Sequence, residues 1–308
     1  MSGFGPLFHG DDSAEAAISA LVRALQQRHG DSLRSLLFYG SCLRSGNLHD
    51  GLVDLYAVVD GYRHARLGPA AALANRLLPP NVYYLETRSG AGPVRCKYAL
   101  FSEEALARGV SANSLESYLW GRLCQPVAVA WAADETALAS ARAALHRATV
   151  TFLDETLPLA EEKGYVSDIW ATGLTQSYMT ELRTEPPDRA AGIAEQSAAY
   201  LAAATAFVAS ELRWPMRVGG EFFTCVIPDA DRARAVRRWA RRRIQGKCVS
   251  VLRLLKALFT FDGGLDYIAW KLERHTGRPV AIPERVRRFP LLFVWGFMWK
   301  LRREGFFR

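Results

Sequence analysis

An acidic residue inside an apolar strand constrains this chain more than any other sequence feature. The run 52–59, closed by Asp60-Gly61, predicts a β-strand that carries Asp54 near its start. The apolar run 35–39 predicts a second strand and ends in Gly40-Ser41, and twelve residues separate Ser41 from Asp54. A Gly-Ser pair after a strand can be only a turn, and an aspartate in a strand can be an edge residue. The spacing alone therefore leaves a structural and a functional interpretation open.

The functional interpretation is a site for a nucleoside triphosphate. Backbone N–H groups exposed after the first strand, with the Ser41 hydroxyl, can bind phosphates, while Asp54 on the neighbouring strand can bind a bridging Mg²⁺. This arrangement is typical of nucleotidyltransferases. Their usual motif has a second acid two residues after the first, and here that position is Tyr56.

The remaining pattern predicts a mixed α/β N-terminal part followed by helices. We expect a helix over 13–29 and two further strands, 82–85 and 94–101, joined as a hairpin. After residue 102 the pattern is mostly helical, and helices are expected at 102–108, 114–124, 134–163, 168–182, 189–213, 231–260 and 264–274.

The five cysteines and the apolar runs place the chain in a broad class. The cysteines are odd in number and widely spaced, with no C-x-x-C pair, so a reducing compartment is expected rather than a disulfide framework or a zinc site. The run 289–299 has 11 residues, whereas a spanning helix needs about 20. We expect neither secretion nor a transmembrane helix.

Five short segments together resemble one known family. They are Gly40-Ser41 with Val53-Asp54-Leu55, residues 95–102 around Lys97-Tyr98, residues 118–127 around Gly121-Arg122, residues 177–183 from Ser177 to Arg183, and residues 255–260 with Tyr267. Their order and composition resemble the mitochondrial-type phosphatidate cytidylyltransferases, a nucleotidyltransferase family that also lacks the second acid. The segments extend from about residue 36 to residue 274.

The resemblance is not complete. Cys42, Ala99 and Thr180 stand where the family usually has glycine, and Glu181 stands in place of an aspartate. Glutamate keeps the charge and the ligand chemistry of aspartate with one more methylene group. The shape of the loop and the preferred lipid or nucleotide are therefore left open.

The resemblance implies a fold, a reaction and a set of residues. The fold is a polymerase-β-like nucleotidyltransferase α/β domain with a helical, winged-helix-like C-terminal domain. The reaction is transfer of CMP from CTP to phosphatidic acid, giving CDP-diacylglycerol and pyrophosphate, with Mg²⁺ as cofactor. The implied catalytic residues are Asp54, Glu181 and Lys97, of which Asp54 and Glu181 are also the metal ligands. The implied nucleotide-binding residues are Gly40, Ser41, Arg122, Arg183 and Tyr178.

A missing second acid fits an acceptor that is already ionised. A phosphate monoester has its second pKa near ~6, so it needs positioning more than a base at neutral pH. The alternatives are a nucleotidyltransferase that acts on RNA or a small-molecule hydroxyl, and a membrane-bound nucleotide-binding pseudoenzyme. Lys97 and Arg122 can also be ordinary surface cations, and Glu181 an exposed helix residue.

The charge distribution supplies a second, independent signal. The chain has a net charge of +8, but residues 232–308 carry +15 and residues 1–231 carry −7. We therefore expect two domains, residues 1–225 with the nucleotidyltransferase part and appended helices, and residues 226–308 as a basic helical domain. Seven arginines in 232–243 favour an anionic partner.

The end of the chain combines aromatic residues with cations, as interfacial membrane segments do. The expected membrane-contacting residues are Trp295, Trp299, Phe306 and Phe307. A helix docked in the core is the alternative, and nucleic acid is not expected because no RNA-binding signature is present. The expected location is cytoplasmic, peripheral on the inner face of the membrane.

Overall fold

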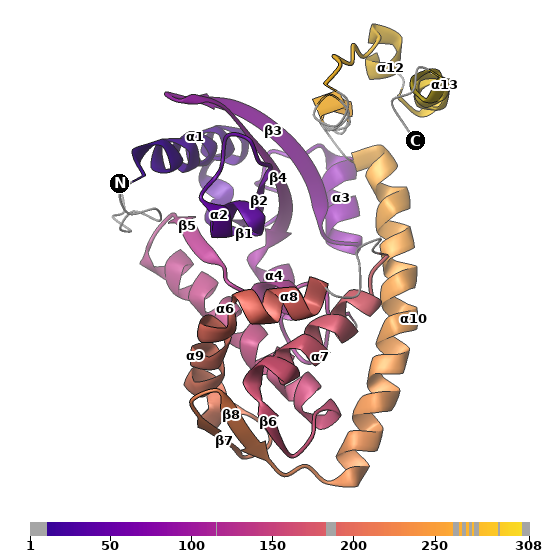
Figure 1. Ribbon diagram of the computed structural model, residues 1–308. Coiled ribbons are helices and arrows are strands. Elements are labelled where there is room, and N and C mark those ends of the chain that lie inside the picture. Colours follow the sequence, from indigo (N-terminus) through magenta and orange to yellow (C-terminus); the bar gives the residue numbers. More distant parts are fainter. Residues whose placement is uncertain are drawn as a thin grey trace.

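The computed structural model describes residues 11–114, 116–182, 189–260, 265–266, 269–270, 273, 277–288 and 290–303 (Figure 1). The helices are α1 (Asp12–His29), α2 (Ser41–Ser45), α3 (Pro69–Leu77), α4 (Glu103–Gly109), α5 (Trp120–Leu123), α6 (Glu135–Thr156), α7 (Val166–Met179), α8 (Arg189–Gln196), α9 (Ala198–Val208), α10 (Asp229–Thr260), α12 (Glu284–Arg288) and α13 (Pro290–Arg303). The strands are β1 (Leu33–Tyr39), β2 (Val53–Val59), β3 (Asn81–Ser89), β4 (Gly92–Ser102), β5 (Ala128–Ala132), β6 (Lys163–Tyr165), β7 (Met216–Gly219) and β8 (Phe222–Cys225).

The larger sheet is mixed and has the strand order β3-β4-β2-β1-β5. β2 runs parallel to β4, while the β1–β2, β1–β5 and β3–β4 pairs are antiparallel. The four strands predicted from the sequence are confirmed, including the β3–β4 hairpin. β5 was missed, because its five residues, Ala128–Ala132, include three alanines and lack a long β-branched run.

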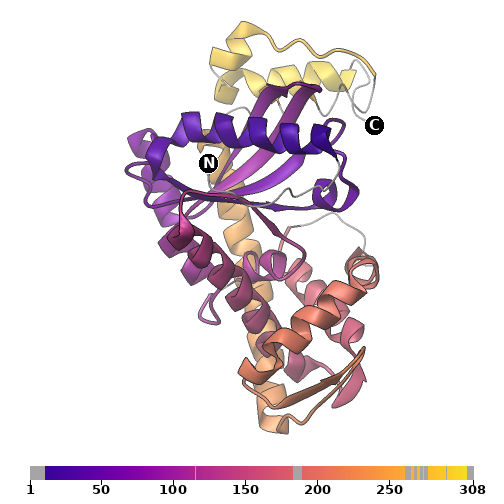
Figure 2. The same ribbon diagram turned by 90° about the vertical axis from the view of Figure 1, so that its left-hand side faces the viewer.

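Both faces of the larger sheet are covered (Figure 2). On one face α1 packs its buried side chains against Phe38, Leu55 and their neighbours. On the other face Leu37, Tyr56 and Phe101 belong to a larger core with α5, α6 and α7. This double burial explains why β2 reads as a continuous apolar run, in which every residue except Asp54 is buried.

The helical part below the sheet contains the smaller sheet, of order β6-β8-β7. Its strands lie between residues 163 and 225, before the predicted division at 226, and the described regular structure after 226 is helical. The helix predicted over 134–163 ends at Thr156, where a 3₁₀ turn with Pro158 follows. The helix predicted over 189–213 is divided at Ser197 into α8 and α9.

Helix α10 runs along the whole helical part and reaches the sheet (Figure 1). Its Trp239 is fully buried in the same core as α6 and α7. Its far end contacts α3 and β3 through Arg253 and Lys256, which donate hydrogen bonds to the backbone carbonyls of residues 78–80. The α10 segment of 226–308 is therefore fastened to the N-terminal body.

A separate small cluster of buried side chains joins Ala269, Val280, Val286 and Phe297.

None of the helices in the described ranges is long and apolar enough to cross a membrane.

Candidate functional site

Three neighbouring strands bring the first site residues together. The register pairs Tyr39 of β1 with Asp54 of β2, and Asp54 with Lys97 of β4. The Lys97 Nζ lies 3.3 Å from Asp54 Oδ1, and about a quarter of the Asp54 side chain is exposed. The aspartate is thus held at the end of the sheet, where its carboxylate meets a cation and an open space rather than the core.

Gly40 is required where β1 turns into α2. Its φ is +91°, a conformation that side chains disfavour, and a Cβ there would stand 2.9 Å from Asp54 Oδ2. Only glycine lets the chain turn while the carboxylate lies beside it. The exposed Ser41 then begins α2, so its hydroxyl and the adjoining backbone face the same space as Asp54.

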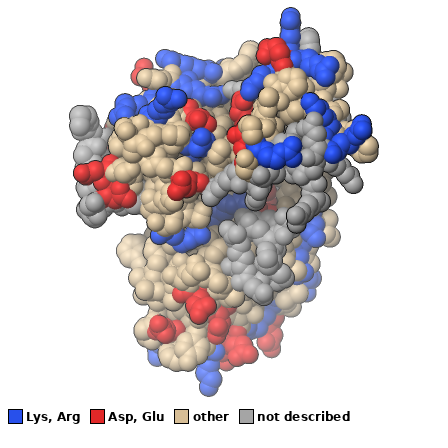
Figure 3. All heavy atoms as spheres, turned by 45° about the horizontal axis from the view of Figure 1, so that its top comes forward, with Lys and Arg blue, Asp and Glu red and all other residues tan. Residues whose placement is uncertain are grey.

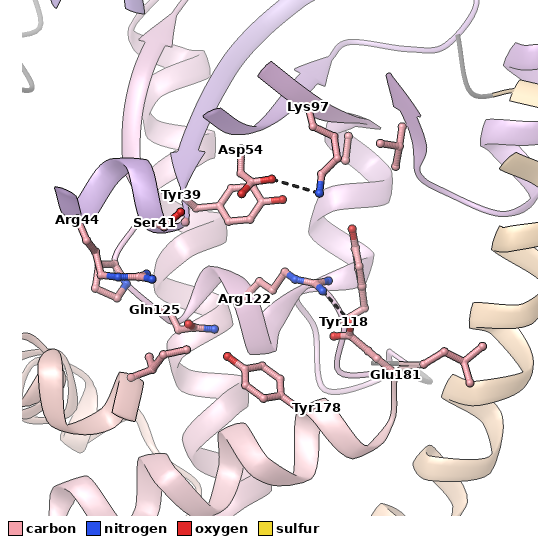
Figure 4. Close-up of a pocket in the computed structure, with 16 residues that line it drawn as sticks. Tyr39, Ser41, Arg44, Asp54, Lys97, Tyr118, Arg122, Gln125, Tyr178 and Glu181 are labelled. Carbon is pink, nitrogen blue, oxygen red and sulfur yellow. Dashed lines mark hydrogen bonds and ion pairs between the residues drawn. The ribbon is translucent and has the colours of Figure 1, made fainter. Parts of the chain in front are cut away.

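These residues line a cavity of about 520 Å³ between the sheet and the helices (Figure 4). Its described wall includes every predicted catalytic residue and four of the five predicted nucleotide-binding residues, Gly40, Ser41, Arg122 and Tyr178. The fifth, Arg183, lies outside the described residues. Segments more than 120 residues apart therefore meet at one site, as the motifs predicted.

Arg122 and Glu181 form an ion pair across the cavity wall. Arg122 Nη2 donates to Glu181 Oε2 at 2.6 Å, and the two side chains are only 17% and 12% exposed. Gly121 makes this approach possible, because a Cβ there would overlap the Ser177 hydroxyl of α7. Burial by itself lowers the pKa of Arg122, but the Glu181 carboxylate raises it well above its usual value. Arg122 is therefore cationic at every physiological pH.

One donor of Arg122 remains available. Its Nη1 is buried and has no hydrogen-bond partner in the described part of the chain. A buried unsatisfied donor costs free energy, and such groups occur at sites that bind ligands. We interpret Nη1 as a donor for an anion in the cavity.

The sequence analysis missed several cavity residues. They are Tyr39, Arg44, Val82, Ala99, Tyr118, Gln125, Pro126, Leu182 and Ile193. Arg44 follows Ser41 by three residues on α2, so helical spacing from a predicted site residue would have found it. Tyr118 precedes α5 and lies in the family-like segment 118–127. Val82 and Ile193 carry no such signal.

Tyr118 connects the site to α10. The guanidinium carbons of Arg122 and Arg253 lie 4.3 and 4.8 Å from the centre of its ring. Arg253 in turn makes a bidentate ion pair with Glu116, at 2.7 and 2.5 Å. Two cations are thus held near one aromatic ring by two separate carboxylates.

The cavity fits Mg²⁺ through one carboxylate. Mg²⁺ is usually held by one or two carboxylates and the phosphates of a substrate, and it keeps several waters. Asp54 meets this requirement, whereas Glu181 contacts Arg122 through its Oε2. Within the described ranges, no group of three or more His, Cys, Asp or Glu side chains could hold a metal.

The predicted membrane-contacting residues and one polar loop residue lie away from the cavity or outside the described residues. Trp299 is 62% exposed on α13, while Phe306, Phe307 and the side chain of Trp295 lie outside the described residues. His64, a polar loop residue near the end of β2, pairs with Asp60 at 3.3 Å and does not line the cavity.

No protein-family model matches the chain, and a search of curated proteins finds no significant match. The family resemblance stays a prediction.

Proposed function

We propose that the chain is an Mg²⁺-dependent CTP:phosphatidate cytidylyltransferase of the polymerase-β-like kind. The observation that carries this proposal is the meeting of Ser41, Asp54, Lys97, Arg122 and Glu181 around one cavity. They come from four of the five family-like segments, and their meeting around one cavity supports a common site.

The cavity has suitable groups for a triphosphate. Ser41 and the backbone after β1 would bind the β- and γ-phosphates, and Arg44 on the same short helix would add a cation. Asp54 would hold Mg²⁺, which neutralises phosphate charge when it is bound. Lys97, whose Nζ lies 3.3 Å from Asp54 Oδ1, would contact the same phosphates.

The acceptor would be a phosphate monoester. One of its oxygens attacks the α-phosphorus of CTP, a new P–O bond forms, the bond to the β-phosphate bridge breaks, and pyrophosphate leaves. No proton has to be removed, because the second pKa of the acceptor is about 6. Arg122 would offset the charge of two phosphates brought close together.

The pairing of the two cavity carboxylates favours this acceptor over a hydroxyl. A hydroxyl acceptor needs a general base within reach. Of the two acids in the described wall, Asp54 pairs with Lys97 and Glu181 pairs with Arg122. Each carboxylate thus already contacts a cation, an arrangement that suits metal binding and arginine positioning better than proton uptake.

An anionic bilayer would be the partner surface. On α13, the exposed Leu292, Phe293 and Trp299 follow helical spacing, and Lys300 and Arg303 are exposed on the same helix. Figure 3 shows Lys and Arg gathered over the α12–α13 end. Apolar side chains beside cations are typical of helices that lie at a membrane interface.

One assay tests the proposal. The full-length protein is incubated with CTP, Mg²⁺ and phosphatidate vesicles, and CDP-diacylglycerol and pyrophosphate are measured. We expect both products in equal amounts, none when EDTA removes the metal, and none with Asp54→Asn. Glu211→Gln, an exposed acid that does not line the cavity, is the matched control and should retain activity.

Two results would contradict the proposal. One is a fully folded protein that binds CTP but forms no CDP-lipid, which would support the pseudoenzyme. The other is faster transfer to a hydroxyl acceptor than to phosphatidate.

A further inference from the structure

A second cavity, of about 240 Å³, adjoins the first. The two share Val82, Tyr118, Glu181 and Leu182 as a common wall. The rest of its described lining comes from Pro80 at the sheet edge and from residues 250–260 of α10. A molecule that enters one cavity can therefore extend into the other past Tyr118.

The second cavity has the opposite chemical character. Apolar side chains such as Val82, Leu254 and Ala257 dominate its surface. Its two cations are turned to other partners, because Arg253 pairs with Glu116, and Lys256 Nζ donates to two backbone carbonyls. What remains towards the interior is an apolar lining next to a polar cavity.

The apolar surface continues out of the cavity. Leu254 is 61% exposed and Leu182 is 51% exposed, so both stand at its mouth. Val251, one turn before Leu254 on α10, and the adjacent Leu255 are exposed as well. Contiguous exposed apolar side chains mark a binding surface more often than an ordinary one.

We propose that the second cavity binds the apolar tail of the phosphate-monoester acceptor, whose phosphate lies in the first cavity. This inference rests on the proposed function for the identity of the phosphate. The wall that the two cavities share supports the acceptor tail as the ligand. An acceptor with a charged head and an alkyl tail matches a polar cavity that opens into an apolar one. A nucleobase fits less well, since base recognition needs several hydrogen-bonding groups, and apolar surface predominates here although Ser250 and Thr260 also line the cavity.

The test uses alkyl phosphates and needs no catalysis. Binding of n-butyl and n-octyl phosphate, both below their micelle concentrations, is measured by calorimetry on the full-length protein. Each methylene that leaves water contributes up to about fourfold in affinity, so we expect octyl phosphate to bind at least about tenfold more tightly. Leu254→Asp should remove most of this difference.

The control variant is on the same helix. Ile244→Asp changes a side chain that is 69% exposed and does not line the cavity, so the tenfold difference should persist. Ala257→Phe, which fills the cavity, is the second variant and should also weaken octyl phosphate selectively. Thermal denaturation verifies that each variant is folded.

Three outcomes would overturn the inference. They are equal affinities for the two alkyl phosphates, equal effects of Leu254→Asp and Ile244→Asp, and weaker CTP binding in Ala257→Phe with unchanged octyl phosphate binding. The last would assign the cavity to the nucleotide. Failure of the proposed function looks different, because tail binding would then persist without transfer of CMP.

Discussion

Two arginine–glutamate pairs of this molecule share the same chemistry but differ in where they lie. Arg242 donates to Glu155 at 2.5 Å, and the two side chains are 4% and 3% exposed. Arg122 donates to Glu181 at 2.6 Å, but this pair forms part of a cavity wall. The first pair is almost completely buried, whereas the second faces a space large enough for a ligand.

The surroundings of each pair explain what it does. Around Arg242, the rings of Trp120 and Trp239 lie at 5.4 Å, and Trp239 Nε1 donates to the Glu155 carbonyl. The contacts to Glu155 fasten α10 to α6. Arg122 by contrast keeps a buried Nη1 without a described partner. An ion pair is therefore a functional candidate when one of its donors remains unsatisfied beside a cavity.

The largest effect on stability is expected from breaking the Arg242–Glu155 pair, here called the enclosed pair. Glu155→Gln leaves Arg242 buried without a countercharge, and such a change typically costs about 3–5 kcal/mol of folding free energy. Urea denaturation measures it. Glu211→Gln, an exposed acid in the same helical part, is the control and should cost less than about 1 kcal/mol. A loss as small as in the control would show that the enclosed pair does not fasten α10.

Substitutions in the Arg122–Glu181 pair, here called the cavity pair, should reduce activity more than stability. Arg122→Gln removes a cation aimed at the proposed phosphates, and loss of such a group costs about 10²–10³ in kcat. The free energy of unfolding should change much less than in Glu155→Gln, because water in the cavity can solvate Glu181. Steady-state kinetics with CTP and phosphatidate, together with urea denaturation, measures both. A loss of stability equal to that of Glu155→Gln would make the two pairs equivalent.

The variant Glu181→Gln distinguishes two roles of Glu181, which are to position Arg122 and to bind the metal. If Glu181 only holds Arg122, a neutral partner weakens a charged hydrogen bond, worth about 1.5–3 kcal/mol, and activity falls about 10–100-fold. The Mg²⁺ concentration for half-maximal rate should then remain unchanged. A large increase in that concentration would instead support the sequence prediction that Glu181 binds the metal. Glu181→Asp keeps the charge and should retain more activity than the glutamine variant.

The sequence predicted one pair better than the other. Arg122 and Glu181 each lie in a segment with a family-like motif, so both were selected before the structure. Arg242 was predicted only as one of seven arginines on a basic helix face. Its burial depends on Glu155, 87 residues earlier, and no local pattern records a contact over that distance.

The same limit applies to the fold. Strands β1 to β4 were predictable because their apolar runs are bounded by turn residues. The three- and four-residue strands of the smaller sheet are too short to show a period, and they form because the core of α6 and α7 brings them together. The second cavity was not predicted at all, since its walls come from the sheet edge and from α10, about 170 residues apart.

The smallest effect is expected at the edge of the enclosed pair. Arg238 Nη1 also donates to Glu155, at 2.6 Å, but its side chain is 44% exposed. Arg238→Gln leaves the Arg242–Glu155 pair intact, and an exposed ion pair contributes about 0–1 kcal/mol, so urea denaturation should show a loss in that range. Raising the salt concentration should reduce this small difference further, because the exposed charge is screened while the enclosed pair is not. A loss of about 3 kcal/mol would mean that Glu155 needs both arginines. The contrast with the cavity pair would then reflect the number of cations around each carboxylate rather than its enclosure.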